Sequence, residues 1–121
     1  MIKVIYCMRR KAGLSHGEFL VHWADVHVPV VMANLKVLRL ASYVRTLPLE
    51  HAYSARVERN GIMLPPFDGI AELSWASEED MRLAFESDEA LVVQRLLARD
   101  EAHFVDPAGS CRWVAQQVRH V

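Results

Sequence analysis

The distribution of apolar residues along the chain predicts four strands. Residues 2–8 form a short apolar run rich in β-branched side chains, which is typical of a strand buried on both sides. In residues 38–47 the side chains are expected to point alternately to two faces, and Pro48 ends the segment. Residues 69–75 are again apolar on both faces, and residues 110–118 are predicted as the last strand.

A first helix is predicted between the first two strands. Ser15 stands three residues before Glu18, the reciprocal pair that satisfies free backbone donors at a helix start. Pro29 lies inside the helical pattern and predicts a kink or a break near His27. Four apolar residues at steps of four, three and four are expected to share the face that packs on the sheet: Phe19, Trp23, Val26 and Val30.

A second helix is predicted after residue 77. Ser77 supplies a cap, and the acidic residues that follow it favour a helix N-terminus. Ser87 and Asp88 interrupt the pattern, so the helix is expected to restart there. Between the second and third strands, about residues 48–67 keep no helical or strand period. Loops of this length are uncommon and usually functional or mobile, so this segment is predicted to be a flap.

The order strand, helix, strand, strand, helix, strand predicts a ferredoxin-like α+β sandwich with both helices on one face of the sheet. The uncovered face is expected to carry large apolar groups. An apolar patch of that size normally marks an interface, so we expect a homodimer in which two bare faces close an α/β barrel. The candidate residues for this face are Ile5, Ala71, Leu73, Trp75 and Trp113.

Length and charge narrow the class of protein further. A chain of 121 residues fits a single domain, residues 1–121. Its net charge of −1 favours neither nucleic acid nor a membrane surface as partner, and no apolar run is long enough to span a bilayer. We therefore expect a cytoplasmic protein. Cys7 and Cys111 are expected to be buried free thiols rather than a disulfide.

The residues that could carry chemistry gather on the first helix and the second strand. Trp23 and His27 lie one turn apart and are expected to face the sheet, whereas His22 is expected to face outward. His27 is either a structural residue or a general acid or base beside the helix break. Tyr43 is either a core aromatic or a hydrogen-bond donor near that imidazole.

Charged residues offer several further candidates. Arg39 and Arg45 are expected on the Tyr43 face, where either could steer an anionic substrate or pair with Glu72. Near the C-terminus, Asp100, His103 and Asp106 could hold a metal but lack a fourth ligand at familiar spacing. Capping of backbone donors by the two aspartates, with Phe104 in the core, is the preferred interpretation. No metal is therefore predicted. The missing phosphate loop and nucleophile elbow argue against a nucleotide cofactor or a covalent serine mechanism.

The order and spacing of several short motifs resemble the EthD-domain family. Residues 1–10 followed by 15–19, then Trp23, His27 and Pro29, are similar to the opening of that domain. Residues 68–73, 77–79 and 100–106 resemble its second half. The resemblance covers nearly the whole chain except the flap. His103 stands where the family pattern leads us to expect arginine, so a shared role there does not carry over.

The resemblance implies a dimeric α/β barrel related to aromatic polyketide cyclases, a methylmuconolactone methylisomerase and cofactor-free monooxygenases. The family's namesake accompanies an ether-degrading (ethyl tert-butyl ether) cytochrome P450 system. We therefore expect a cofactor-independent isomerase, cyclase, dehydratase or oxidoreductase acting on a small apolar carbonyl, lactone or aromatic compound, in catabolism or secondary metabolism. The alternatives are a non-catalytic small-molecule-binding or accessory protein of an oxygenase system, and a dimeric module whose pocket is filled by its own side chains.

In the enzyme hypothesis, each candidate residue has a role. His27 is the general base or acid, and Tyr43 donates a hydrogen bond to developing oxyanion charge. Substrate contacts are assigned to four further residues, of which Asp100 carries over as a pattern position of the family: Phe19, Trp23, Arg39 and Asp100.

Overall fold

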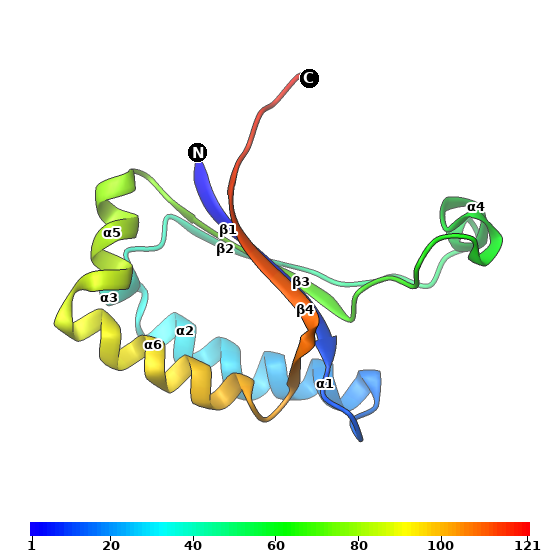
Figure 1. Cartoon of the computed structure of the whole chain (residues 1–121), viewed down its shortest axis with the longest axis horizontal. Coiled ribbons are helices and arrows are strands. Elements are labelled where there is room, and N and C mark those ends of the chain that lie inside the picture. The colour runs from blue at the N-terminus through cyan, green and yellow to red at the C-terminus, as the bar shows by residue number, and fades with distance from the viewer.

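The structure, a computed structural model, describes all 121 residues and contains one four-stranded antiparallel sheet with its main helices on one side (Figure 1). The strands lie in the order β2-β3-β1-β4, so the first and third strands occupy the centre. The predicted ferredoxin-like α+β fold is confirmed. The strands are β1 (Ile2–Arg10), β2 (Ser42–Thr46), β3 (Gly69–Trp75) and β4 (Val105–Gln116).

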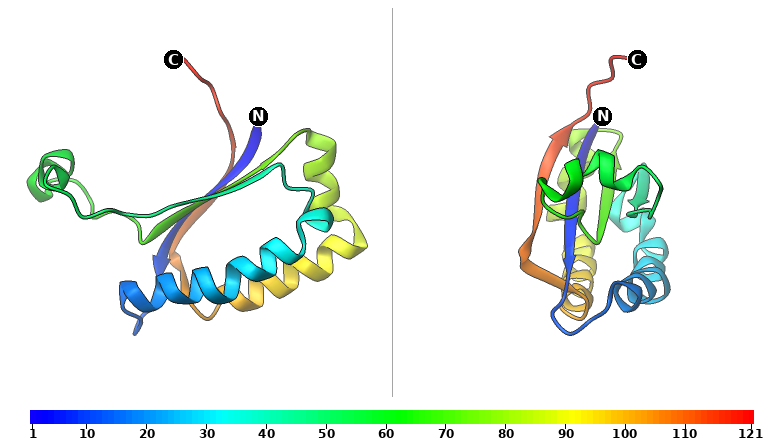
Figure 2. Two further views of the ribbon diagram at one scale, coloured as in Figure 1. Left: turned by 180° about the vertical axis from the view of Figure 1, so that it is seen from behind. Right: turned by 90° about the vertical axis from the view of Figure 1, so that its right-hand side faces the viewer.

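The helices form a second layer beneath the sheet, as the left view of Figure 2 shows. Each long connection between strands contributes several of them. None of the helices combines the length and apolar character that a membrane crossing requires. The connection between β1 and β2 contains α1 (His16–His22), the π-helical turn η1 (Trp23–His27), α2 (Val28–Ala33) and α3 (Leu35–Leu38). The last holds α5 (Glu78–Glu86) and α6 (Asp88–Glu101).

The helix starts lie where the capping residues predict them. Ser15 and Glu18 form the reciprocal capping box at α1. Ser77 Oγ accepts from the Asp80 backbone N–H at α5. Ser87 is extended and caps α6 through the Ala90 N–H, so the predicted interruption and restart of the second helix are confirmed.

The first helix is interrupted near His27, as predicted, but by a π-helical turn that moves its buried face. The Val28 N–H donates to the Trp23 carbonyl, five residues back, so one extra residue is accommodated. Val26 is wrong as a member of the buried face, since it is 46% exposed, whereas Val30 is half-buried and packs against the cluster that contains Val31. His27 is buried, as predicted, and Val31 joins the buried face, because the extra residue rotates everything after it by about 100°.

The second strand begins later than predicted. Leu35–Leu38 is a short helix that ends where Arg39 takes a left-handed conformation with φ of 52°. The Leu38 carbonyl accepts from Trp75 Nε1 at 2.8 Å. Arg39 therefore does not share a strand face with Tyr43, and its guanidinium pairs with Asp80 at 3.2 Å. The last strand, by contrast, begins five residues before its predicted start.

The strand register decides which residues face the helices. Tyr6 pairs with Ala71 and Val4 with Leu73, and these side chains belong to clusters packed against the helices. The expectation that Ala71, Leu73 and Trp75 lie on the bare face is therefore wrong. The bare face carries the opposite residues of each strand: Lys3, Ile5 and Cys7 of β1, Val44 of β2, Ile70 and Glu72 of β3, and Cys111 and Trp113 of β4.

Two cysteines meet on that face. Cys7 lies opposite Cys111 across the β1 and β4 pair, and both are free thiols. Cys7 is buried as predicted, whereas Cys111 is exposed, because β4 is an edge strand with no neighbour on its outer side. Both cysteines are free thiols, as predicted, but the predicted burial is correct only for Cys7.

Residues 47–67, hereafter the arm, connect β2 to β3 and stand away from the body of the molecule (Figure 1). The arm contains the short helix α4 (Ser54–Val57) and the 3-10 turn η2 (Arg59–Gly61). The prediction that this segment has no regular secondary structure is therefore wrong. Whether it acts as a functional flap stays a prediction at this point.

The indole of Trp23 fills the space between the first helix and β3. It is 1% exposed, packs against Phe19 and lies directly over Gly69. A Cβ atom at Gly69 would approach the ring to 2.3 Å, closer than any real contact. Glycine is thus required at this position by close packing.

We expect Gly69→Ala to lower the free energy of unfolding by about 1–3 kcal/mol, because the added methyl overpacks the core. Urea denaturation followed by circular dichroism measures the loss. Gly17→Ala is the matched control, since its nearest atom would be Ser15 Oγ at 3.9 Å, and it should not destabilise the protein. Equal stability of the two variants would contradict this account of the Trp23 contact.

Candidate functional site

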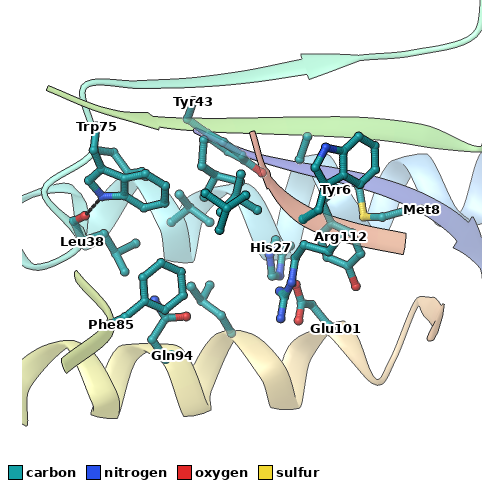
Figure 3. A pocket seen from close by; sticks show the side chains of 18 of the residues that line it. Tyr6, Met8, His27, Leu38, Tyr43, Trp75, Phe85, Gln94, Glu101 and Arg112 are labelled. Carbon is teal, nitrogen blue, oxygen red and sulfur yellow. Dashed lines mark hydrogen bonds and ion pairs between the residues drawn. The ribbon is translucent and has the colours of Figure 1, made fainter. Parts of the chain in front are cut away.

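A cavity of about 240 Å³ lies between the sheet and the helices, and most of its lining is hydrophobic. Figure 3 shows an apolar end with Leu38, Trp75 and Phe85. Two of the lining residues, Phe85 of α5 and Val114 of β4, are 43% and 60% exposed. The cavity therefore opens to solvent between α5 and β4. The other end is polar: Tyr6, His27, Glu101 and Arg112 (Figure 3).

His27 is held at the polar end by a carboxylate behind it. Its Nδ1 lies 2.8 Å from Asp100 Oδ2, and the other carboxylate oxygen lies 2.9 Å from His22 Nε2. A neutral imidazole must donate from Nδ1 to this carboxylate, which fixes the tautomer with an unprotonated Nε2. Since the ring lines the cavity and Nε2 has no protein partner, a basic nitrogen is available to a ligand.

The electrostatic environment keeps His27 neutral and Asp100 ionised. Burial lowers the pKa of His27 below 6.5, and the hydrogen bond and charge of Asp100 only partly oppose this effect. Burial of Asp100 would by itself raise the pKa of that carboxyl, but the hydrogen bonds from His22 and His27 outweigh it and lower the pKa below 3.8. Near neutral pH, the pair is therefore a neutral base oriented by an anion.

Tyr43 presents its hydroxyl to the same cavity. Its oxygen accepts a hydrogen bond from Trp23 Nε1 at 3.1 Å, and Arg45 lies over the indole at 5.0 Å. Because a phenol has one proton, the Tyr43 O–H is left to donate to a ligand in the cavity. Burial raises the pKa of Tyr43, so the hydroxyl keeps its proton at neutral pH.

A second ionisable group faces the same space. Glu101 follows Asp100 on α6 and lines the cavity, and its closest cation is Arg112 at 3.9 Å. Burial raises the pKa of Glu101, the nearby Asp100 charge adds to this, and Arg112 opposes it. Arg112 also lies over the Tyr6 ring, and burial raises the pKa of Tyr6 to about 12. The cavity is thus lined by two phenols, Tyr6 and Tyr43, and by a carboxyl with a raised pKa.

The structure brings three of the six predicted site residues to one cavity: His27, Tyr43 and Trp23. Phe19 lies in the core behind Trp23, and Asp100 lies behind His27 without lining the cavity. Arg39 does not line the cavity, and its guanidinium pairs with Asp80 instead.

Two further expectations about polar residues need correction. His22 does not face outward, since its ring packs on Phe104 and binds Asp100. Asp100 does not cap backbone donors, whereas Asp106 does, accepting from the Ala108 N–H at 3.0 Å. Phe104 is fully buried, as predicted.

Sequence reasoning did not find Tyr6, Glu101 or Arg112 as site residues. Tyr6 and Arg112 lie on opposite ends of the chain and meet only through the β1 and β4 register. Glu101 lies beside Asp100, in the segment whose aspartates were assigned to the capping of backbone donors. Its position one residue after Asp100 on a helix was the available signal, because consecutive helical side chains point about 100° apart.

The sequence matches the EthD domain family over residues 11–108, most of the chain. The chain belongs to the EthD family. None of the curated proteins is similar enough in sequence to match it. The expectation drawn from the short motifs is therefore confirmed at the level of the family.

Solved structures agree with an EthD fold. An EthD family protein from Bacillus halodurans is 15% identical with a TM-score of 0.65, over 98% of this chain and 99% of that one. A protein from Bacteroides fragilis, described as dimeric, of unknown function and ferredoxin-like, is 9% identical with a TM-score of 0.59, covering 96% and 95%. A hydroxynitrile lyase from Passiflora edulis is 17% identical with a TM-score of 0.52, covering 98% and 96%. At these identities the likeness concerns the fold.

The lowered pKa of His27 predicts a pH dependence of stability in this EthD protein. Below pH 6.5 the unfolded chain binds a proton at residue 27 more readily than the folded chain, so the free energy of unfolding falls as the pH decreases. One proton contributes at most about 1.4 kcal/mol per pH unit. We expect His27→Gln to show a smaller slope than wild type between pH 5 and 6.5 in urea denaturation. Identical slopes would show that His27 does not remain neutral in the folded state.

Proposed function

We propose that this EthD protein is a cofactor-independent enzyme that transfers protons on a small, uncharged carbonyl, lactone or aromatic compound. One observation carries the proposal: the Asp100 bond orients His27 so that a basic Nε2 faces an apolar cavity also lined by Tyr43. A general base must reach the substrate and be unprotonated at the working pH, and the burial that lowers the pKa of His27 fulfils the second condition.

In the proposed reaction, His27 removes a proton from the carbon next to the carbonyl. Nε2 takes the proton, and the electron pair of the C–H bond moves into an enolate. Asp100 stabilises the imidazolium that forms, because it already accepts from Nδ1. The attraction between the Asp100 carboxylate and the imidazolium arises only when His27 has taken the proton, so it stabilises the transition state more than the ground state.

Tyr43 stabilises the negative charge that develops on the substrate oxygen. Its O–H is directed into the cavity by the Trp23 hydrogen bond and requires little rearrangement to donate. Glu101, protonated more readily than an ordinary carboxyl, supplies a second proton donor from α6. A base and an acid lining one cavity suit isomerisation, cyclisation or elimination. The shared fold with a hydroxynitrile lyase is compatible with the last type.

The dimensions and charge of the cavity limit the substrate. A cavity of 150 Å³ accommodates benzene, so about 240 Å³ suits a ligand of roughly ten non-hydrogen atoms. The mostly hydrophobic lining favours a one-ring compound without a net charge.

The test is proton exchange on one-ring ketones and lactones, such as acetophenone, in D₂O. Proton NMR measures the loss of the hydrogens next to the carbonyl, because each deprotonation is followed by deuteration. We expect exchange with wild type, a loss of about 10²- to 10⁴-fold in His27→Gln, and wild-type rates in the control His120→Gln. Tyr43→Phe should reduce exchange without abolishing binding.

Mass spectrometry of ligands that copurify with the protein extends the panel. A copurifying compound that binds but undergoes neither exchange nor turnover would refute the enzyme proposal and favour the non-catalytic binding or accessory protein. Equal exchange by wild type and His27→Gln would instead reject His27 as the base.

We also propose that the protein forms a homodimer through its bare sheet face. The similar Bacteroides fragilis protein is described as dimeric, which supports a dimer. Trp113 and Val44 are 48% and 46% exposed there, and Ile5 lies between their strands. Pairing two such faces removes these side chains from water.

Sedimentation equilibrium tests this dimer. We expect wild type to sediment as a dimer and Val44→Asp as a monomer at the same concentration, because a carboxylate would be buried between two sheets. Val92→Asp, which changes an exposed residue of α6 on the opposite layer, is the control and should remain dimeric. A monomeric wild type would refute the proposal.

A further inference from the structure

The arm exposes more large apolar side chains than any other segment of its length. Seven residues between positions 47 and 64 are at least 41% exposed, and three of them exceed 75%: Leu49, Ile62 and Leu64. Single exposed apolar residues are ordinary, but a contiguous group of this size marks a contact surface. None of the arm residues lines the cavity of its own chain, so the arm is not a lid on that site.

The arm is nevertheless held in a defined shape. Within it, the Val57 N–H donates to the Tyr53 carbonyl at 3.0 Å and the Ile62 N–H to the Arg59 carbonyl at 3.1 Å. At its base, the Arg9 guanidinium donates to the carbonyls of Pro65 and Pro66. An ordered segment that presents its apolar residues to water is costly unless a partner covers them.

The base of the arm is fixed to the central strand as well. The Arg9 guanidinium lies over the Phe67 ring at 4.2 Å, and Asp68 pairs with Arg10 at 2.8 Å. These contacts orient the returning limb of the arm relative to the sheet. The direction in which the arm projects is thus a property of the folded body.

That direction is toward the bare side of the sheet. Figures 1 and 2 show the arm leaving the end of β2 and β3 away from α5, on the side of the sheet opposite the helices. The exposed Val44 of β2 therefore continues into the exposed Leu47 and Leu49 of the arm. The chain therefore runs directly from the bare face into the arm, and exposed apolar side chains lie on both.

From this continuity we infer that the arm of each copy reaches across the dimer interface and packs against the second copy of the chain. The inference rests on the proposed sheet-face dimer and extends it by an exchanged contact. A second copy seated on the bare face would lie on the side toward which the arm projects. The arm then buries its apolar residues at no cost in new loop ordering, because its shape is already set.

The charges of the arm favour this occupant over a membrane. Residues 47–67 contain two acidic and two basic side chains, so the arm has no excess of positive charge to attract anionic lipid: Glu50, Glu58, Arg56 and Arg59. A neutral, apolar arm meets no electrostatic repulsion from an identical copy.

The test compares two pairs of equivalent substitutions by sedimentation equilibrium. Ile62→Asp with Leu64→Asp places two charges on the arm, and Val92→Asp with Leu96→Asp places two on the exposed side of α6. We expect the arm variant to raise the dimer Kd at least about tenfold and the α6 variant to leave it unchanged. Circular dichroism checks that both retain the fold, which exposed positions should allow.

Hydrogen exchange gives a second readout that a local folding defect would not reproduce. In wild type, amides of residues 58–66 should exchange more slowly at protein concentrations above the dimer Kd than below it. An unchanged Kd in the arm variant, with exchange independent of concentration, would overturn the inference while leaving the sheet-face dimer intact. A monomeric wild type would instead refute the dimer itself. Vesicle binding by wild type that the arm variant loses, at constant Kd, would assign the arm to lipid and also overturn the inference.

Discussion

The four-residue spacing of Phe19, Trp23, His27 and Val31 is the constraint on which the rest of the structure depends. In a regular α-helix, the first and last of these residues would lie about 120° apart. The π-helical turn at Trp23–His27 accommodates one extra residue and reduces this to about 20°, so all four are buried in one line. Without that turn, the imidazole would rotate away from both Asp100 and the cavity.

The Trp23 side chain contributes both to the stability of the core and to the geometry of the site. The indole packs over Gly69 and so fixes the distance between the first helix and β3. The indole N–H also donates a hydrogen bond to the Tyr43 oxygen, so the hydroxyl proton of Tyr43 is directed toward the cavity. Tyr43 is therefore oriented by the packing core, and the precision of the site follows from close packing rather than from flexible loops.

Local signals in the sequence predicted local structure well. Ser15 with Glu18, Ser77 and Ser87 marked three helix starts, because a cap depends on residues within one turn. The errors arose where distant contacts decide the outcome. Val26 was assigned to the buried face by assuming 3.6 residues per turn throughout. The second strand was predicted to include Leu38, whose carbonyl instead accepts from the distant Trp75 before the chain turns at Arg39.

The candidate site could be predicted only in part for the same reason. His27, Tyr43 and Trp23 could be predicted because the helix and strand periods place them, whereas Glu101 and Arg112 meet through the pairing of distant segments.

The position of Asp100 and Glu101 at a helix end has a further physical consequence. Asp100 and Glu101 occupy the last turn of α6, where the negative end of the helix dipole disfavours carboxylates. Two histidines compensate Asp100, while Glu101 has only a distant arginine. One helix end therefore supplies both the anion that orients the base and a carboxyl whose pKa is raised by burial.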